Sequence, residues 1–93
     1  MAENKSDTSL TTTHRWLTAV AEELGIDPEL VRGLVGDILD LTAAVAHNGP
    51  SRPAAPTTAF VVGLAAGAGA GDAATVRDMV ARVEEMLSTY EQN

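Results

Sequence analysis

The chain has 93 residues, of which 45% are apolar, and a formal net charge of −7 at neutral pH. This length predicts one domain, and the acidic balance argues against nucleic acid and anionic membranes as partners. The absence of cysteine excludes a disulfide framework, a thiolate metal site and a cysteine nucleophile.

The N-terminal segment is polar and shows no apolar periodicity. Residues 1–10 are therefore predicted to form a disordered tail, and residues 11–91 a single helical domain. The segment also lacks the apolar core of a secretion signal, which predicts a cytoplasmic protein.

The first helix is expected to begin at Thr11–Thr13, which offer a side-chain cap, and to end at Gly25. Apolar residues recur between these points at helical spacing. They are Trp16, Leu17, Val20, Ala21 and Leu24. Trp16 is expected to pack in the core or at its edge, since the chain has three aromatic rings in all.

The second helix has the clearest start signal. Asp27 suits the capping position, and Pro28 suits the first helical position, where its missing N–H costs nothing. The helix is expected to run to about His47, before the breaking sequence Asn48-Gly49-Pro50.

The third predicted helix starts at Pro56–Thr58 and holds no charged residue. Its glycines Gly63, Gly67 and Gly71 recur every four residues, which predicts a smooth face for tight helix packing within the fold or for self-association. The strictly apolar part covers residues 59–70, fewer than the roughly 20 residues that a membrane span needs.

The fourth helix is expected to be capped by Asp72, with an apolar stripe from Val76 to Tyr90. The links at residues 25–27 and at Gly71 are short, and the link between the second and third helices is longer and proline-rich. The sequence therefore predicts an all-α fold: a compact four-helix bundle, largely antiparallel, with one proline-rich long loop between helices 2 and 3.

Motifs of enzymatic chemistry are absent from the sequence. A phosphate-binding loop needs Gly-Lys-Ser or Gly-Lys-Thr, and neither occurs. His14 and His47 lack the paired helical spacing of a metal site. The second helix begins Asp27-Pro28-Glu29-Leu30, without the Asp-Ser-Leu motif of acyl carrier proteins. We therefore expect no catalytic residue, no metal, no cofactor and no enzymatic activity.

Arg52 is the one formally charged residue in the range 42–70 and lies in the proline-rich link. In one interpretation, its planar guanidinium binds an anion or a partner's carboxylate. His47 and free backbone N–H groups of Thr57 and Thr58, at the start of the third helix, would assist.

In the other interpretation, Arg52 is a structural clamp. It would cap the carbonyl end of the second helix, or pair with Asp37 or Asp40 on that helix. The residues leave both interpretations open.

Several segments of the chain resemble a family of short, uncharacterised actinobacterial helical proteins. These segments are Trp16–Leu17, Glu23–Gly25, Ala46–His47, Arg52–Pro56 and Thr58–Gly67. Members of that family occur alone or appended to molybdopterin-guanine dinucleotide biosynthesis proteins of the molybdenum cofactor nucleotidyltransferase type. The resemblance covers roughly residues 14–90 and implies an accessory role near molybdenum cofactor assembly or molybdoenzymes. It transfers no catalytic residue, because the glycine-rich nucleotide-binding start of the nucleotidyltransferase is missing here.

The sequence thus predicts a non-enzymatic helical interaction module. Its partner would be another protein or a second copy of the chain, contacted through the Arg52 loop and the glycine face of the third helix. The alternative is a small-ligand binder that takes a phosphorylated or nucleotide-like anion at Arg52 and the start of the third helix.

Overall fold

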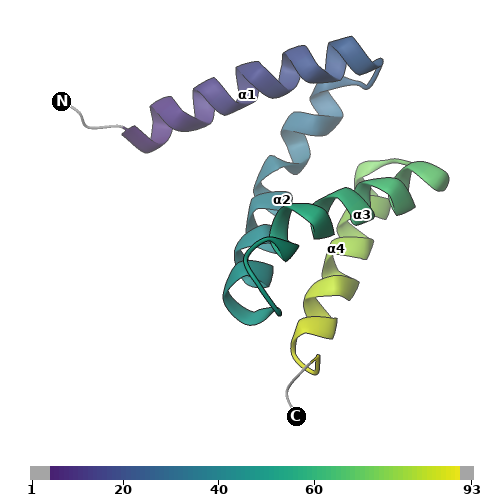
Figure 1. Cartoon of the computed structure of the whole chain (residues 1–93). Coiled ribbons are helices and arrows are strands. Elements are labelled where there is room, and N and C mark those ends of the chain that lie inside the picture. Colours follow the sequence, from purple (N-terminus) through teal and green to yellow (C-terminus); the bar gives the residue numbers. More distant parts are fainter. Residues whose placement is uncertain (1–4, 91–93) are drawn as a thin grey trace. The chain divides into compact units, whose positions relative to one another are not determined.

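Four α-helices make up the protein in a computed structural model that describes residues 5–90 (Figure 1). They are α1 (Lys5–Leu24), α2 (Pro28–Asn48), α3 (Ala54–Ala68) and α4 (Ala73–Leu87). Within residues 5–90 there is no strand, so the predicted all-α fold of four helices is confirmed.

The chain divides into two compact units, and the boundary lies inside α2, between Gly33 and Leu34. The N-terminal unit holds α1 and the first turns of α2. The C-terminal unit holds the rest of α2 together with α3 and α4, and the chain reverses direction at each of its two links (Figure 1). The prediction of a single domain over residues 11–91 stays a prediction.

In the N-terminal unit, α1 begins at Lys5, earlier than the start predicted at Thr11–Thr13. Residues 5–10 of the predicted tail are helical, and residues 1–4 lie outside the described residues. The stretch from Lys5 to Leu24 contains neither glycine nor proline, so nothing in it stops a helix from extending upstream once it has formed.

The predicted end of α1 at Gly25 is confirmed. Gly25 has a positive φ of 75°, a conformation that costs glycine little. Its N–H donates to the Glu22 carbonyl at 3.3 Å, and the Ile26 N–H donates to the Ala21 carbonyl at 2.8 Å. This pair of bonds is the Schellman arrangement, which satisfies carbonyls at a helix end.

The predicted start of α2 is confirmed as well. Oδ1 of Asp27 accepts from the Glu29 N–H at 3.0 Å, and Pro28 is the first helical residue. At the other end, the Gly49 N–H donates to the Val45 carbonyl at 2.8 Å. A Cβ at Gly49 would lie 2.6 Å from that carbonyl oxygen, so this turn requires glycine.

The link between α2 and α3 covers residues 49–53, and α3 begins at Ala54 instead of the predicted Pro56–Thr58. Pro53 occupies the N-cap with a φ of −60°, the value that its ring imposes. Pro56 falls in the first turn, where a proline breaks no helical hydrogen bond. The prolines therefore start the helix sooner, and the proline-rich loop is shorter than expected.

The helix α3 ends at Ala68, so Gly71 does not belong to the glycine face predicted for this helix. Gly71 has a φ of 68° and lies in the turn before α4. Asp72 then caps α4 as predicted, because its Oδ1 accepts from the Thr75 N–H at 2.8 Å.

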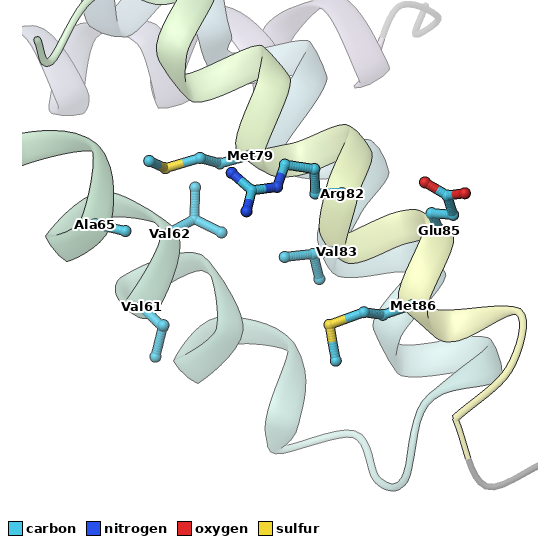
Figure 2. Close-up of a pocket in the computed structure, with 8 residues that line it drawn as sticks. All are labelled: Val61, Val62, Ala65, Met79, Arg82, Val83, Glu85 and Met86. Carbon is cyan, nitrogen blue, oxygen red and sulfur yellow. The ribbon is translucent and has the colours of Figure 1, made fainter. Parts of the chain in front are cut away.

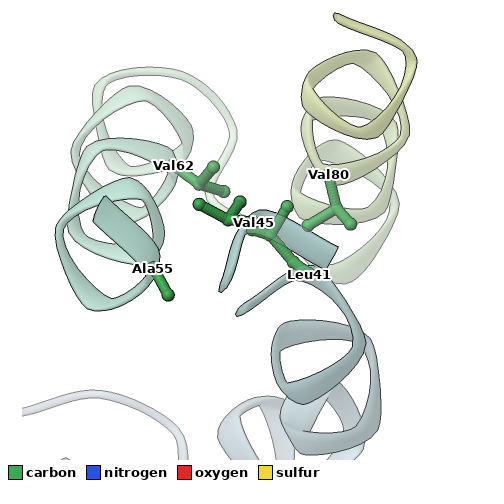
Figure 3. Packing of buried hydrophobic residues seen from close by; sticks show 5 residues of the cluster. All are labelled: Leu41, Val45, Ala55, Val62 and Val80. Atoms are coloured by element: carbon green, nitrogen blue, oxygen red, sulfur yellow. The ribbon is translucent and has the colours of Figure 1, made fainter. Parts of the chain in front are cut away.

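The core of the C-terminal unit is small and draws on all three of its helices (Figure 3). Its buried members are Leu41, Val45, Ala55, Val62 and Val80. Leu41, at 0% exposure, is the largest side chain that is fully enclosed among the described residues. The core therefore uses one side of α3, and the other side lies outside it.

Candidate functional site

The side chain of Arg52 is exposed in the turn before α3. Within the described part of the chain it has no hydrogen bond or ion pair, and the carboxylate of Asp37 pairs with Arg77 instead. No contact in this part of the chain therefore supports the interpretation of Arg52 as a structural clamp on α2.

The first turn of α3 holds no free backbone donor for an anion. Helical geometry leaves the N–H groups of the N-cap and the next three positions without helical partners, and these are residues 53–56. Pro53 and Pro56 have no N–H. The Ala54 N–H donates to the Ser51 carbonyl at 3.2 Å, and the Ala55 N–H donates to the Arg52 carbonyl at 3.0 Å.

The expectation of free N–H groups at Thr57 and Thr58 is therefore wrong, because both residues lie past the first turn. The hydroxyl of Thr57 donates to the carbonyls of Pro53 and Ala54 at 3.1 and 3.0 Å. His47 is exposed in the last turn of α2, and within the described residues its side chain forms no hydrogen bond or ion pair with Arg52. The described contacts therefore do not bring Arg52, His47, Thr57 and Thr58 together as donors for one anion.

The outer side of α3 carries large apolar side chains in contact with solvent. Phe60 is 64% exposed, and Val61 and Leu64 are each 59% exposed. At 3.6 residues per turn they lie away from the buried side, which holds Ala55, Val62 and Ala66. We call Phe60, Val61, Gly63, Leu64 and Gly67 the α3 outer face.

Both glycines of this face are open. A Cβ built on Gly63 or Gly67 would meet no atom within 4 Å. The sequence left packing within the fold and self-association open for these glycines, and the prediction of such a face stays a prediction. The α3 outer face is smooth at its glycines and ridged at Phe60 and Leu64.

An apolar groove of about 560 Å³ runs beside this face, between α3 and α4 (Figure 2). Val61, Val62 and Ala65 line it from α3. The α4 side contributes Met79, Arg82, Val83, Glu85 and Met86. Its volume lies in the range of small-molecule and peptide-anchoring pockets.

The charged groups of the groove lie at its rim. In Figure 2 the guanidinium of Arg82 extends toward α3, whereas the carboxylate of Glu85 points away from it. Arg82 also approaches Asp78 through an Nη1–Oδ2 distance of 3.7 Å, and both side chains are largely exposed. The groove therefore offers apolar contact with a single cation at its edge, which suits binding better than acid–base chemistry.

Sequence reasoning missed most of this surface. The sequence pattern singled out the glycines of the third helix but neither Phe60 nor Leu64, and Met86 lies within the apolar stripe predicted for the fourth helix, yet all three side chains are exposed. A signal was available, since residues 59–68 are apolar or glycine on every side and a chain of this size buries a smaller share of its surface than a large one. Trp16, expected in or at the core, is likewise 67% exposed.

The described residues contain neither a candidate metal site nor a candidate membrane span. No group of three or more histidine, aspartate or glutamate side chains among them is placed to hold a metal ion. No helix in the described range has the length and apolarity needed to cross a membrane.

Residues 8–93 match the family described as Domain of unknown function (DUF6457). No curated protein and no solved structure matches the chain.

Proposed function

We propose that this chain, which belongs to the DUF6457 family, is a non-enzymatic interaction module that binds a helix of a partner through the α3 outer face. One observation carries the proposal. Phe60, Val61 and Leu64 stand exposed together on a helix without a single charged residue. Clustered apolar exposure of this kind marks interaction sites on soluble proteins.

The energetic argument starts from these three side chains. Burying a valine, leucine or phenylalanine side chain completely is worth about 1.5–3 kcal/mol relative to leaving it exposed. Each of the three still has more than half of its surface available for burial. A partner that covers them gains several kcal/mol, on the scale of an interface hot spot.

The shape of the face favours a helical partner. Gly63 and Gly67 present no side chain and have open space above them. A second helix can approach the backbone closely there, while Phe60 and Leu64 form a ridge that packs against its side. A second copy of this chain supplies a matching ridge and smooth strip, so a symmetric dimer through α3 is the simplest form of the proposal.

Charge adds to this preference. The whole chain carries a net charge of −7, so most of its surface repels another acidic protein. The α3 helix is uncharged, and Arg52 precedes it as an exposed cation. Contact through this end of the molecule avoids the repulsion, and Arg52 can meet a carboxylate of the partner.

The proposal is tested by site-specific cross-linking in the native cell. A photoreactive phenylalanine analogue replaces Leu64 in one variant and Leu24 of α1, which is at least as exposed, in a control. We expect a discrete cross-linked product from position 64 and none from position 24. The mass of the product tells a second copy from another protein, and the absence of a product at position 64 would refute the proposal.

A finer form of the proposal places the partner in molybdenum cofactor assembly or among molybdoenzymes. It rests on the resemblance of residues 14–90 to the actinobacterial helical proteins alone. Deletion of the gene should then lower the activity of a molybdoenzyme and leave a molybdenum-independent enzyme unchanged. If the deletion changed the activity of neither enzyme, the link to molybdenum would be refuted. The proposal of a helix-binding α3 outer face would not be affected.

A further inference from the structure

A second hollow lies in the N-terminal unit, on one side of α1. It has a volume of about 400 Å³, and its lining residues are Thr11, His14, Arg15, Thr18 and Arg32. The first four recur at helical spacing, so α1 presents them on one face, and Arg32 comes from the second turn of α2.

The charged residues that line the hollow are positive, whereas the net charge of the whole protein is negative. The chain has 13 carboxylate side chains against 6 lysines and arginines, yet two of those arginines and a histidine line this one hollow. No aspartate or glutamate is among its lining residues. Glu29 offsets part of the Arg32 charge, but the lining still concentrates cations in an otherwise acidic chain, which favours an anion at this place over the rest of the surface.

The hollow also offers donors of the kind that phosphate oxygens accept. Its lining residues carry two guanidiniums, two hydroxyls and an imidazole, and each of these groups can donate a hydrogen bond. Arginine in particular matches a phosphate through parallel N–H groups.

Arg32 forms an ion pair with Glu29. Its Nη2 donates to Oε2 of Glu29 at 3.0 Å, one turn earlier on α2. A guanidinium has five N–H donors, so this bond orients the group and leaves further donors for a ligand. The pair is exposed, so it holds Arg32 loosely.

We propose that this hollow is a binding site for a small phosphorylated molecule, with Arg15 and Arg32 as its principal contacts. Its volume exceeds what one phosphate group fills and lies within the usual range for small-molecule sites. The proposal is independent of the α3 outer face, because every lining residue belongs to the N-terminal unit.

The test uses the whole chain labelled with ¹⁵N and titrated with inorganic phosphate and with pyrophosphate at low ionic strength. We expect saturable shifts of amide signals near residues 11–18 and 32, with tighter binding of pyrophosphate. Arg15→Gln and Arg32→Gln should each weaken binding at least about tenfold, because each removes charge-assisted hydrogen bonds to the phosphate. Circular dichroism verifies that each variant keeps its helices.

Arg82→Gln is the matched control, because it removes the same charge from an exposed arginine that pairs with a carboxylate of its own helix, as Arg32 does, and lies outside the hollow. It should leave the phosphate affinity unchanged. Equal weakening by all three variants would show only a general attraction of anions and overturn the site, as would a titration without saturation. A phosphoserine peptide that binds more tightly than pyrophosphate would overturn the small-molecule class.

Discussion

Nε of Arg77 donates to Oδ2 of Asp37 at 3.1 Å and so joins α4 to α2 across 40 positions of the chain. The two side chains belong to the C-terminal unit, whose core lies between the same helices. This pairing also occupies Asp37, one of the two carboxylates that the sequence offered to Arg52. The tie between α2 and α4 therefore comes from α4 itself.

The Asp37–Arg77 pair should contribute a measurable but small coupling energy. Both side chains are more than a third exposed, so solvent screens them and we expect roughly 0.2–1 kcal/mol. A double-mutant cycle with Asp37→Ala and Arg77→Ala, read by urea unfolding, measures it. The longer and more exposed Asp78–Arg82 pair is the control and should give less. A larger coupling for Asp78–Arg82 would contradict this ranking.

Leu41→Ala should destabilise the C-terminal unit strongly. Leu41 is fully buried at the centre of the core, so truncation leaves a cavity and costs about 2–5 kcal/mol. Leu39→Ala, two residues away on α2, removes the same atoms from a side chain that is 48% exposed. Its loss of unfolding free energy should be several-fold smaller, and equal losses would show that this core is wrongly placed.

Gly49→Ala and Gly63→Ala should change stability in opposite directions. The new Cβ at Gly49 would lie 2.6 Å from the Val45 carbonyl oxygen, and backbone must move to relieve this clash, at a cost of about 1–3 kcal/mol. The new Cβ at Gly63 meets nothing, and alanine favours a helix by roughly 0.5–1 kcal/mol over glycine. Thermal melts at a concentration that keeps the protein monomeric compare the two. A stabilised Gly49→Ala variant would refute the close approach.

The cap of α4 should make stability depend on acid pH. Hydrogen bonds from Thr75 hold the pKa of Asp72 below its ordinary value of 3.8. A carboxylate with a depressed pKa stabilises the folded state above its unfolded pKa, and this contribution is lost as pH falls through the folded pKa. The difference in melting temperature between the native protein and Asp72→Ala should therefore be largest near neutral pH and shrink below about pH 4.

Asp72→Asn supplies the control for this pH dependence. Asparagine caps helices about as well as aspartate but does not titrate in this range. The variant should keep most of the stability and lose the acid dependence that Asp72 adds. If the Asp72→Ala difference were constant from neutral to acid pH, ionisation of the cap would have no part in it.

The sequence by itself determined where three of the helix ends lie. Gly25, Asp27 and Asp72 act on backbone groups within a few residues, so their side chains or their freedom of φ are enough to end or start a helix. The starts of α1 and α3 were placed several residues late. In α1 nothing halts the helix upstream, and in α3 the N-cap is Pro53, three residues before the predicted start.

Only the tertiary structure decided which side of α3 is covered. Residues 59–68 are apolar or glycine on every side, so periodicity cannot tell the buried side from the open one. Packing against Leu41 and Val80 selects Val62 and leaves Phe60 and Leu64 outside. The cationic hollow could not be predicted from the sequence either. Arg15 and Arg32 lie on different helices, and the turn that joins these helices brings them to one space.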